Sequence, residues 1–404
     1  MNIEKIRSDF PVLQKQVNGK PFAYLDSACT SLKPKPVLDA MNSYYSDYTG
    51  CAGRSVHKFA KRTEEEFAKA RAKAAKFVNA KKPNEIIWTK SATEAINLVA
   101  HSLKFEKGDR VVTTNLEHSS GLLPWHAVAA EKGISLDFVL CNKEGEFNPE
   151  EFKEKIGRKT RLVSIIHASN VTATVSPLKE ITKIAHDAGA LVLADSAQSV
   201  PHFPVDVKQL GIDFLAFSGH KMIGPTGIGC LYGKEDLLEK LNPMLLGGET
   251  ITDADLNSHV LAEVPERLEA GIQNYAGAIG LGAAIDYLSG IGMKKIEAYE
   301  KELGKILVEG LLNNPKIDLI GPKDSKKRGS LAAFNAKGMD PHDVALMLND
   351  KNFFVRSGMH CAYPIHKFLG LKKGSVRASL YFYNSKEEVK LFIENLSTII
   401  KNFS

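Results

Sequence analysis

The stretch DFLAFSGHKMIGPTGIG, residues 213–229, decides the fold: an apolar run leads directly into Ser218, Gly219, His220 and Lys221, and a glycine-rich turn follows. The apolar run predicts a buried strand, with Lys221 at its carboxyl end. A lysine that is positioned and partly desolvated in this way is suited to form a Schiff base. Ser218 and His220 are candidates for holding an anion. A solvent-exposed lysine in a flexible loop is the alternative.

Outward from this stretch, amphipathic helices alternate with short apolar runs from about residue 65. Helices are expected at 63–80 and 93–103, and buried strands at 85–89, 109–115, 135–140, 162–169, 191–197 and 213–219. This alternation is typical of βαβ units around a mainly parallel, mixed sheet flanked by helices. Polar residues follow the strand ends, where open α/β sheets bind ligands.

The pattern changes in the last third of the chain, where a long charged helix at 294–312 and a final amphipathic helix at 387–402 are expected. We therefore expect a large domain at 17–290 and a smaller α/β domain made of 1–16 and 291–404. The chain shows no internal repeat and no low-complexity linker.

The composition excludes several classes of protein. The net charge of +6 comes from 53 basic and 47 acidic residues spread along the chain, so no nucleic-acid-binding stripe forms. The start lacks the apolar run of a signal peptide, and no later stretch reaches 18 uninterrupted apolar residues, so we expect a cytoplasmic protein without a membrane segment. The cysteines form no CxxC pair, which favours reduced thiols and no metal site; they are Cys29, Cys51, Cys141, Cys230 and Cys361.

A second strand end supports the chemistry proposed for Lys221. LVLADSAQS, residues 191–199, places Asp195 after an apolar run, with Gln198 three residues further on. A buried carboxylate needs a partner, and the pyridinium nitrogen of pyridoxal 5′-phosphate (PLP) is one, since the salt bridge keeps the ring protonated as an electron sink. An aspartate that caps a turn is the alternative.

These residues, with further motifs, resemble class V aminotransferases and, among them, the group II (SufS-like) cysteine desulfurases. The resemblance runs from YLDSACTSLKP at 24–34 to VRASLYFYN at 376–384, so it covers nearly the whole chain. Between them stand, in the family's order, ATEAINLVA (92–100), LEHSSGLLPW (116–125), HASNVTAT (167–174), DSAQS, SGHKMIGPTGIG and RSGMHCAYP (356–364). The resemblance implies a PLP enzyme of fold type I that converts L-cysteine to L-alanine and leaves the sulfur as a persulfide on a cysteine.

The resemblance also implies roles around the cofactor ring. Lys221 is expected to bind the PLP aldehyde and to move the substrate α-proton, while Asp195 pairs with the ring nitrogen and Gln198 donates to O3′. His118 is expected to stack on the ring and is a candidate for proton transfer. Asn170 is expected near the substrate and O3′.

The cofactor phosphate is expected at the helix N-terminus opened by Ala92 and Thr93, because free backbone N–H groups and the helix dipole favour an anion there. Ser218 and His220 are expected to complete this cradle.

The sulfur chemistry is expected at FFVRSGMHCAYPIHKFLG, residues 353–370, which places Cys361 between a strand and a helix, beside His360 and near Arg356. Nearby positive charge favours the thiolate, the nucleophilic form. The resemblance implies that Cys361 attacks the substrate sulfur, that Arg356 and His360 contact the substrate, and that Arg377 binds the substrate carboxylate. An inert core cysteine and a structural arginine are the alternatives.

Two positions depart from the family near the phosphate and the thiol. Ile272 stands where relatives usually have a threonine that reaches the phosphate from the neighbouring subunit, and Gln273 or Asn274 are candidates to replace it. Met359 stands where close relatives often have a histidine, which leaves His360 as the only expected ring beside the thiol.

The N-terminal loops depart as well. Gly53 and Arg54 stand where relatives usually show His-Arg, and Cys29 replaces a small residue. Cys29 and Cys51 are therefore expected near the site, and one hypothesis is that either takes part in sulfur relay or binds a metal or cluster. Thiols that only fill space are the alternative.

The family's active site combines two chains, so a homodimer is expected, with residues 243–251 and 269–274 near the partner's cofactor. A sulfur-acceptor protein or iron-sulfur scaffold is also implied. L-cysteine and L-selenocysteine both stay open as substrates. The competing functions are selenocysteine lyase, aminotransferase, kynureninase, tRNA-dependent cysteine synthesis and a non-catalytic scaffold of the same fold.

Overall fold

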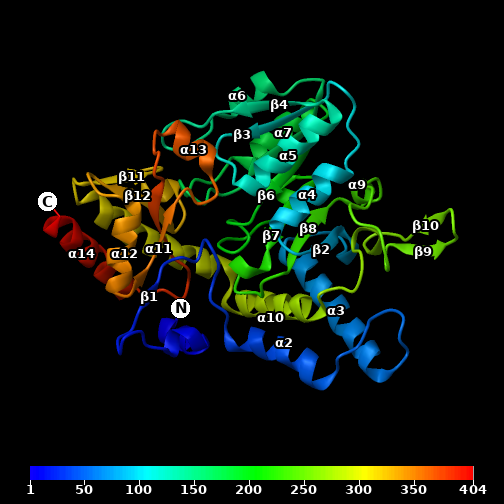
Figure 1. Cartoon of the computed structure of the whole chain (residues 1–404), viewed down its shortest axis with the longest axis horizontal. Coiled ribbons are helices and arrows are strands. Elements are labelled where there is room, and N and C mark those ends of the chain that lie inside the picture. Colours follow the sequence, from blue (N-terminus) through cyan, green and yellow to red (C-terminus); the bar gives the residue numbers. More distant parts are fainter. Residues whose placement is uncertain (404) are drawn as a thin grey trace.

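The computed structural model describes residues 1–403, and its largest sheet has seven strands in the order β2-β8-β7-β6-β5-β3-β4 (Figure 1). The strands are β2 (Ile86–Thr89), β3 (Arg110–Thr114), β4 (Ser135–Val139), β5 (Thr160–Ile166), β6 (Leu191–Asp195), β7 (Phe214–Ser218) and β8 (Gly229–Gly233). The strands β3 to β7 pair in parallel, whereas β8 is antiparallel to both β7 and β2. The predicted mainly parallel, mixed sheet is confirmed.

Helices cover both faces of this sheet, which explains why its strands are apolar at successive positions. The helices of this part of the chain are α2 (Lys35–Asp47), α3 (Lys58–Phe77), α4 (Ala92–Ser102), α5 (Ser119–Lys132), α6 (Pro149–Lys155), α7 (Leu178–Asp187), α8 (Val207–Leu210), α9 (Glu235–Leu238) and α10 (Tyr275–Ile291), and α2 packs on α10 outside the layer that covers the sheet. The core on one face includes residues of α3, α7 and α10, and the core on the other face includes residues of α4 and α5.

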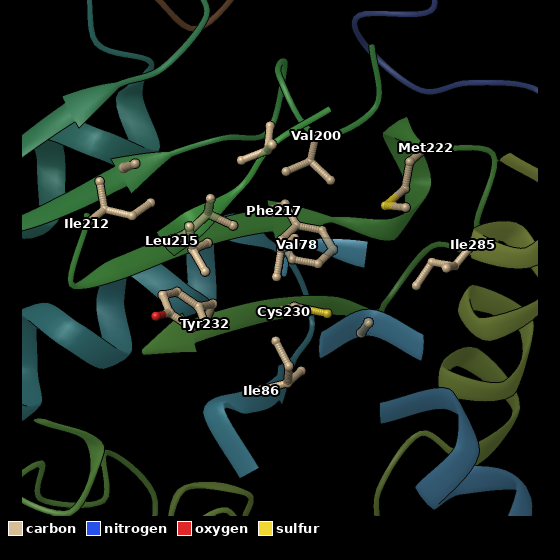
Figure 2. Close-up of a cluster of buried hydrophobic side chains, with 14 of the residues drawn as sticks. Val78, Ile86, Val200, Ile212, Leu215, Phe217, Met222, Cys230, Tyr232 and Ile285 are labelled. Carbon is tan, nitrogen blue, oxygen red and sulfur yellow. The ribbon is translucent and has the colours of Figure 1, made fainter. Parts of the chain in front are cut away.

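Figure 2 shows part of the first core, in which Leu215 and Phe217 of β7 and Cys230 and Tyr232 of β8 pack among apolar side chains. Ile285 of α10 closes this cluster on one side. Burial raises the pKa of the Cys230 thiol well above its usual range, so this cysteine is an inert core residue.

The second sheet is antiparallel, in the order β11-β12-β15-β14. Its strands are β11 (Ile317–Ile320), β12 (Leu331–Ala336), β14 (Arg356–Gly358) and β15 (Ser375–Ser379), and its helices are α11 (Met293–Leu312), α12 (Pro341–Asp350), α13 (Tyr363–Phe368) and α14 (Lys386–Asn402). A capping box formed by Ser385 and Glu388 starts α14. The predicted helices at 294–312 and 387–402 are confirmed.

The N-terminal segment packs against the C-terminal part of the chain. Strand β1 (Ala23–Tyr24) pairs in parallel with β13 (Phe353–Phe354), and Arg7 of α1 (Ile3–Ser8) forms a 2.7 Å salt bridge with Glu388. The division into domains at 17–290 and at 1–16 with 291–404 stays a prediction. Residues 1–403 also contain five 3-10 segments: Pro11–Gln14, Pro83–Glu85, Gly219–Lys221, Glu266–Leu268 and Ser325–Lys327.

The hairpin of β9 (Ile251–Ala254) and β10 (His259–Leu261) projects from the body of the molecule (Figure 1). Within residues 1–403, no single helix is long and apolar enough to cross a membrane. The pair α10 and α11, bent by 75°, passes this test together by length and composition.

Candidate active site

A cavity of about 160 Å³ at the carboxyl ends of β5, β6 and β7 is lined by all the residues expected to bind the cofactor or the substrate from within one chain. Its walls include Ala92, Thr93, His118, Asn170, Asp195, Gln198, Ser218, His220, Lys221, Arg356, His360, Cys361 and Arg377. Because parallel strands end at the same edge of a sheet, residues far apart in the sequence converge here. We call this cavity the strand-end pocket.

Lys221 and Asp195 form the floor of the strand-end pocket. Asp195 ends β6, is 5% exposed and accepts a hydrogen bond from the Ala197 backbone N–H at 3.0 Å. Burial lowers the pKa of the Lys221 amine, while the charge of Asp195 opposes this shift. Burial also raises the pKa of Asp195, and Lys221 opposes that shift. A lysine whose neutral amine is favoured is suited to attack a carbonyl.

The rim near α4 carries hydroxyl groups and helix backbone. The backbone N–H of Ala92 donates to the Ser218 hydroxyl oxygen at 2.8 Å, and the hydroxyls of Thr93 and Ser120 are 2.7 Å apart. The Ala92 N–H, expected to be free for an anion, is therefore already used, because β7 ends directly beside the start of α4. The hydroxyls of Thr93 and Ser218 are left to meet a phosphate at this helix N-terminus.

His118 caps the N-terminus of α5, with its Nδ1 accepting from the Ser120 backbone N–H at 3.1 Å. That bond assigns the ring proton to Nε2. Burial lowers the pKa of His118 to about 3, and Lys221 adds to the shift. The imidazole is therefore neutral at physiological pH, which suits a ring that stacks on an aromatic cofactor.

Unpaired polar atoms show that the strand-end pocket fits a polar ligand. Within residues 1–403, four buried atoms of its walls have no hydrogen-bond partner: Asn170 Oδ1, Gln198 Oε1, His360 Nδ1 and Arg377 Nε. The amide nitrogens of Asn170 and Gln198 donate to the carbonyls of His360 (2.8 Å) and Ala28 (2.7 Å). Since buried polar groups are normally paired, these atoms suit a ligand with several polar groups, such as PLP with a substrate.

The two arginines expected near the substrate have different partners. Arg377 is buried, donates to the Asn170 carbonyl at 3.2 Å and forms a 3.1 Å salt bridge with Asp26. Arg356 donates to Cys29 Sγ at 2.8 Å. The sequence did not indicate Asp26, because its partner lies about 350 positions away. Cys29 lines the strand-end pocket as expected, whereas Cys51 is not among its walls.

Cys361 is exposed between β14 and α13, as predicted, and both it and His360 have left-handed backbone, with φ of 54° and 49°. Two groups of Ser119 fix this loop: its backbone N–H and its hydroxyl donate to the Cys361 carbonyl at 2.6 and 2.9 Å. Such conformations are costly for residues other than glycine and concentrate at functional sites.

The sequence predicted His360 as the only ring beside the thiol, but a second histidine ring lies close to His360. His360 is buried and lies 3.1 Å from the Ser375 hydroxyl through Nε2, and the ring of His366, 5.6 Å away between centroids, shares the same hydroxyl at 3.0 Å. Burial lowers the pKa of His360 to about 2. His366 follows Cys361 by five residues in the quoted loop, and that spacing could have indicated it.

The sequence pattern did not indicate Glu117 as a residue of the site. It is fully buried behind the strand-end pocket and accepts from the Thr114 hydroxyl (2.7 Å) and the Ile166 N–H (3.0 Å). Burial raises its pKa to about 8, and the charge of Asp195 adds to the shift. Burial therefore favours the protonated form of Glu117 at neutral pH.

Ile272, which departs from relatives near the expected phosphate, and its candidate replacements Gln273 and Asn274 are not among the walls of the strand-end pocket. Ile272 is 70% exposed. Asn274 caps α10 by accepting from the Gly277 N–H and also donates to the Gly227 carbonyl, both at 2.8 Å. Gln273 donates to the Gly271 carbonyl at 3.1 Å. In the described part of the chain, no group of three or more His, Cys, Asp or Glu side chains is placed to hold a metal ion.

The seven-stranded sheet, with a lysine and a buried aspartate at neighbouring strand ends, defines an α/β enzyme of the PLP-dependent fold type I. Within that class, the chain belongs to the class V aminotransferase family, whose model matches residues 23–392.

Known relatives and solved structures match this chain over nearly its full length. A probable cysteine desulfurase of Synechocystis sp. is 45% identical over 403 residues, which cover 99% of this chain and 96% of that protein. The apo structure of a cysteine desulfurase from Thermococcus onnurineus NA1 superposes with a TM-score of 0.94 at 42% identity, covering 99% and 98% of the two chains. A C-DES variant with glycine covalently linked to its PLP cofactor gives a TM-score of 0.84 at 25% identity, covering 97% and 98%.

Proposed function

We propose that this chain is a PLP-dependent cysteine desulfurase, which converts L-cysteine to L-alanine and leaves the sulfur as a persulfide on Cys361. The observation that carries the proposal is that one pocket contains both Lys221 and an exposed Cys361. Full-length similarity to proteins named cysteine desulfurase supports it. Transamination, the main competing chemistry, needs no nucleophilic thiol at this position.

When bound, PLP supplies an aldehyde for an amine and a cationic ring that withdraws electrons from the substrate. Lys221 would hold the cofactor through Nζ and afterwards move the substrate α-proton, since burial favours its neutral form. Asp195 would keep the ring nitrogen protonated. His118, unprotonated at Nδ1, would stack on the ring, and Gln198 and Asn170 would contact its O3′.

Polar groups on opposite walls fix the two ends of the bound molecules. Thr93, Ser218 and His220 hold the phosphate at the start of α4. Arg377 and Arg356 offer guanidinium groups to the substrate carboxylate, for which a planar fork is well shaped. The substrate sulfur is then directed toward the loop that carries Cys361.

Cys361 acts as the nucleophile toward sulfur. Its thiolate attacks the sulfur atom of the substrate, so that a bond forms between the two sulfur atoms while the carbon-sulfur bond breaks. The carbon skeleton then takes up a proton and leaves as alanine. The exposure of Cys361 allows a later acceptor to collect the sulfur.

The test compares wild type with Cys361→Ala and Lys221→Ala, all incubated with PLP and L-cysteine. We expect alanine and a persulfide on Cys361 in the wild type only, with the visible PLP absorbance retained in Cys361→Ala. Cys51→Ser is the matched control, because Cys51 does not line the strand-end pocket, and it is expected to keep full turnover. Unchanged alanine release by Cys361→Ala would favour a different class V reaction.

The finer assignments are part of the proposal. We place the chain in group II and in the cytoplasm, with a sulfur-acceptor protein or iron-sulfur scaffold as its partner. L-selenocysteine is the alternative substrate, and a direct comparison of kcat/KM for the two amino acids distinguishes them.

We also propose a homodimer that buries the surface around the β9–β10 hairpin. Three apolar side chains support it: Leu245, Leu246 and Ile272 are each more than half exposed. Sedimentation of wild type and Ile272→Asp tests it. The wild type is expected to sediment as a dimer and the variant to dissociate more readily, whereas a monomeric wild type would contradict the proposal.

A further inference from the structure

The carbonyl oxygen of His220, the residue before Lys221, accepts hydrogen bonds from three residues of the N-terminal segment. Ser31 donates through its backbone N–H at 2.9 Å and its hydroxyl at 3.0 Å. Thr30 donates through its hydroxyl and Lys33 through Nζ, both at 3.1 Å. A carbonyl has two lone pairs, so four donors around one oxygen is an unusual concentration.

Lys33 is the charged member of this group. Its Nζ contacts the His220 carbonyl, the Thr30 hydroxyl at 3.0 Å and the Ser31 carbonyl, and no carboxylate of residues 1–403 pairs with it. Burial lowers its pKa to about 8. Lys33 is half-buried, and a charge in that setting without a counter-ion is costly, so its position depends on these three oxygen partners.

The turn that carries Lys221 is fixed on its other side by the glycine-rich sequence. The backbone N–H of Gly219 donates to the Ile228 carbonyl, and a Cβ at Gly219 would lie 2.9 Å from the Ile228 side chain. The hydroxyl of Ser31 also accepts from the Ile223 N–H at 2.7 Å. The backbone of the turn is therefore held from both sides.

We propose that Lys33 is a positioning residue for Lys221, acting through the His220 carbonyl to hold the turn in the orientation that directs Nζ into the strand-end pocket. The inference rests on the proposed function of Lys221. It assigns the N-terminal segment, some 190 positions from Lys221, a part in catalysis that the sequence did not indicate.

The test uses Lys33→Met, Lys33→Arg and, as the matched control, Lys35→Met. Lys35 is an exposed neighbour that pairs with Asp39 at 2.7 Å. Each apoprotein is mixed with PLP, the bond to Lys221 is followed by absorbance and trapped with borohydride, and the labelled peptide is identified by mass spectrometry. Steady-state kinetics with L-cysteine and thermal unfolding are measured in parallel.

For Lys33→Met we expect the rate of bond formation between PLP and Lys221, and kcat, to fall about tenfold. This factor corresponds to the free energy of one charge-assisted hydrogen bond. KM should change less than about threefold. Lys33→Arg should recover part of both, and Lys35→Met should match the wild type. If Lys33→Met unfolds, Thr30→Val removes one donor to the same carbonyl and is expected to slow bond formation in the same direction.

Bond formation and kcat at the wild-type level in Lys33→Met, or in Thr30→Val where the first variant unfolds, would overturn the inference, even if the melting temperature drops. Failure of the wild type to bond PLP at Lys221 or to release alanine would instead overturn the proposed function.

Discussion

Lys221 and Cys361 reach the same pocket from regions of very different construction. Lys221 follows β7, whose five residues are all buried, and its turn is held by hydrogen bonds from two sides. Cys361 is exposed, in a loop with left-handed backbone at two successive residues. The difference fits the two tasks: the amine must keep one orientation toward the ring, whereas the thiol must meet the substrate and then an acceptor outside.

The largest expected effect tests the support of the Cys361 loop. Gly374, with φ of 81°, starts the return of the chain into β15, and a Cβ there would lie 2.3 Å from the Gly358 backbone. We expect Gly374→Ala to lower the free energy of unfolding by about 4 kcal/mol, since backbone cannot move aside. Urea unfolding measures it.

The control for that variant is Gly370→Ala, which shares a positive φ of 72° but has nothing within 4 Å of the added Cβ. Its cost should be about 1 kcal/mol, from backbone strain alone. Equal losses for the two variants would show that the close contact between Gly374 and Gly358 is not what supports the loop.

The next effect tests the role of Asp195 at the floor of the strand-end pocket. Asp195→Asn removes the charge that we assign to the ring nitrogen, and a hydrogen bond to a charged group contributes up to about 3 kcal/mol, so kcat/KM should fall about 100-fold. PLP absorbance should be retained but shifted. Asp206→Asn, at a surface helix cap, is the control and should keep its activity. Full activity of Asp195→Asn would show that the reaction does not need the negative charge of Asp195.

A pH-dependent effect tests the buried acid behind the floor of the strand-end pocket. The folded pKa of Glu117 is raised to about 8 from 4.5, so between these values the folded state binds a proton that the unfolded chain has released. Stability from this group is complete below pH 4.5 and is lost as pH rises toward 8, at about 1.4 kcal/mol per pH unit.

Glu117→Gln should therefore lack this decline. Urea unfolding of the variant and the wild type at pH 5, 6, 7 and 8 measures the difference, and Glu154→Gln on the surface serves as the control. Parallel curves for Glu117→Gln and the wild type would mean that Glu117 is ionised in the folded protein.

The smallest effect tests the attachment of the loop to α5. Ser119→Ala removes one of the two hydrogen bonds to the Cys361 carbonyl and leaves the backbone N–H in place. We expect a loss of stability of about 0.5–1 kcal/mol. Alkylation of Cys361 by iodoacetamide should become about twofold faster as the loop opens more often. A slower alkylation would contradict this account of the loop.

The local sequence pattern was enough to predict that Asp195 and Lys221 lie at strand ends in the same pocket. The apolar runs before Asp195 and Lys221 indicated neighbouring strands, and neighbouring parallel strands end at one edge, so both side chains had to converge. The Cys361 loop was also found in the sequence, through its resemblance to a known family. What the pattern missed are partners: Asp26 for Arg377, His366 for His360, and the four donors around the His220 carbonyl.

By itself, the sequence determined six of the seven strands of the large sheet, the α/β class of fold and the residues at the strand ends, because each depends on periodicity over a few neighbouring positions. It did not indicate the antiparallel strand β8. Only the tertiary structure decided that Glu117 is buried with a raised pKa, that Arg356 meets Cys29, and that Lys33 faces the turn of Lys221. Those properties depend on burial and on contacts between segments as far as 327 residues apart, and a pattern of neighbouring residues contains no information about either.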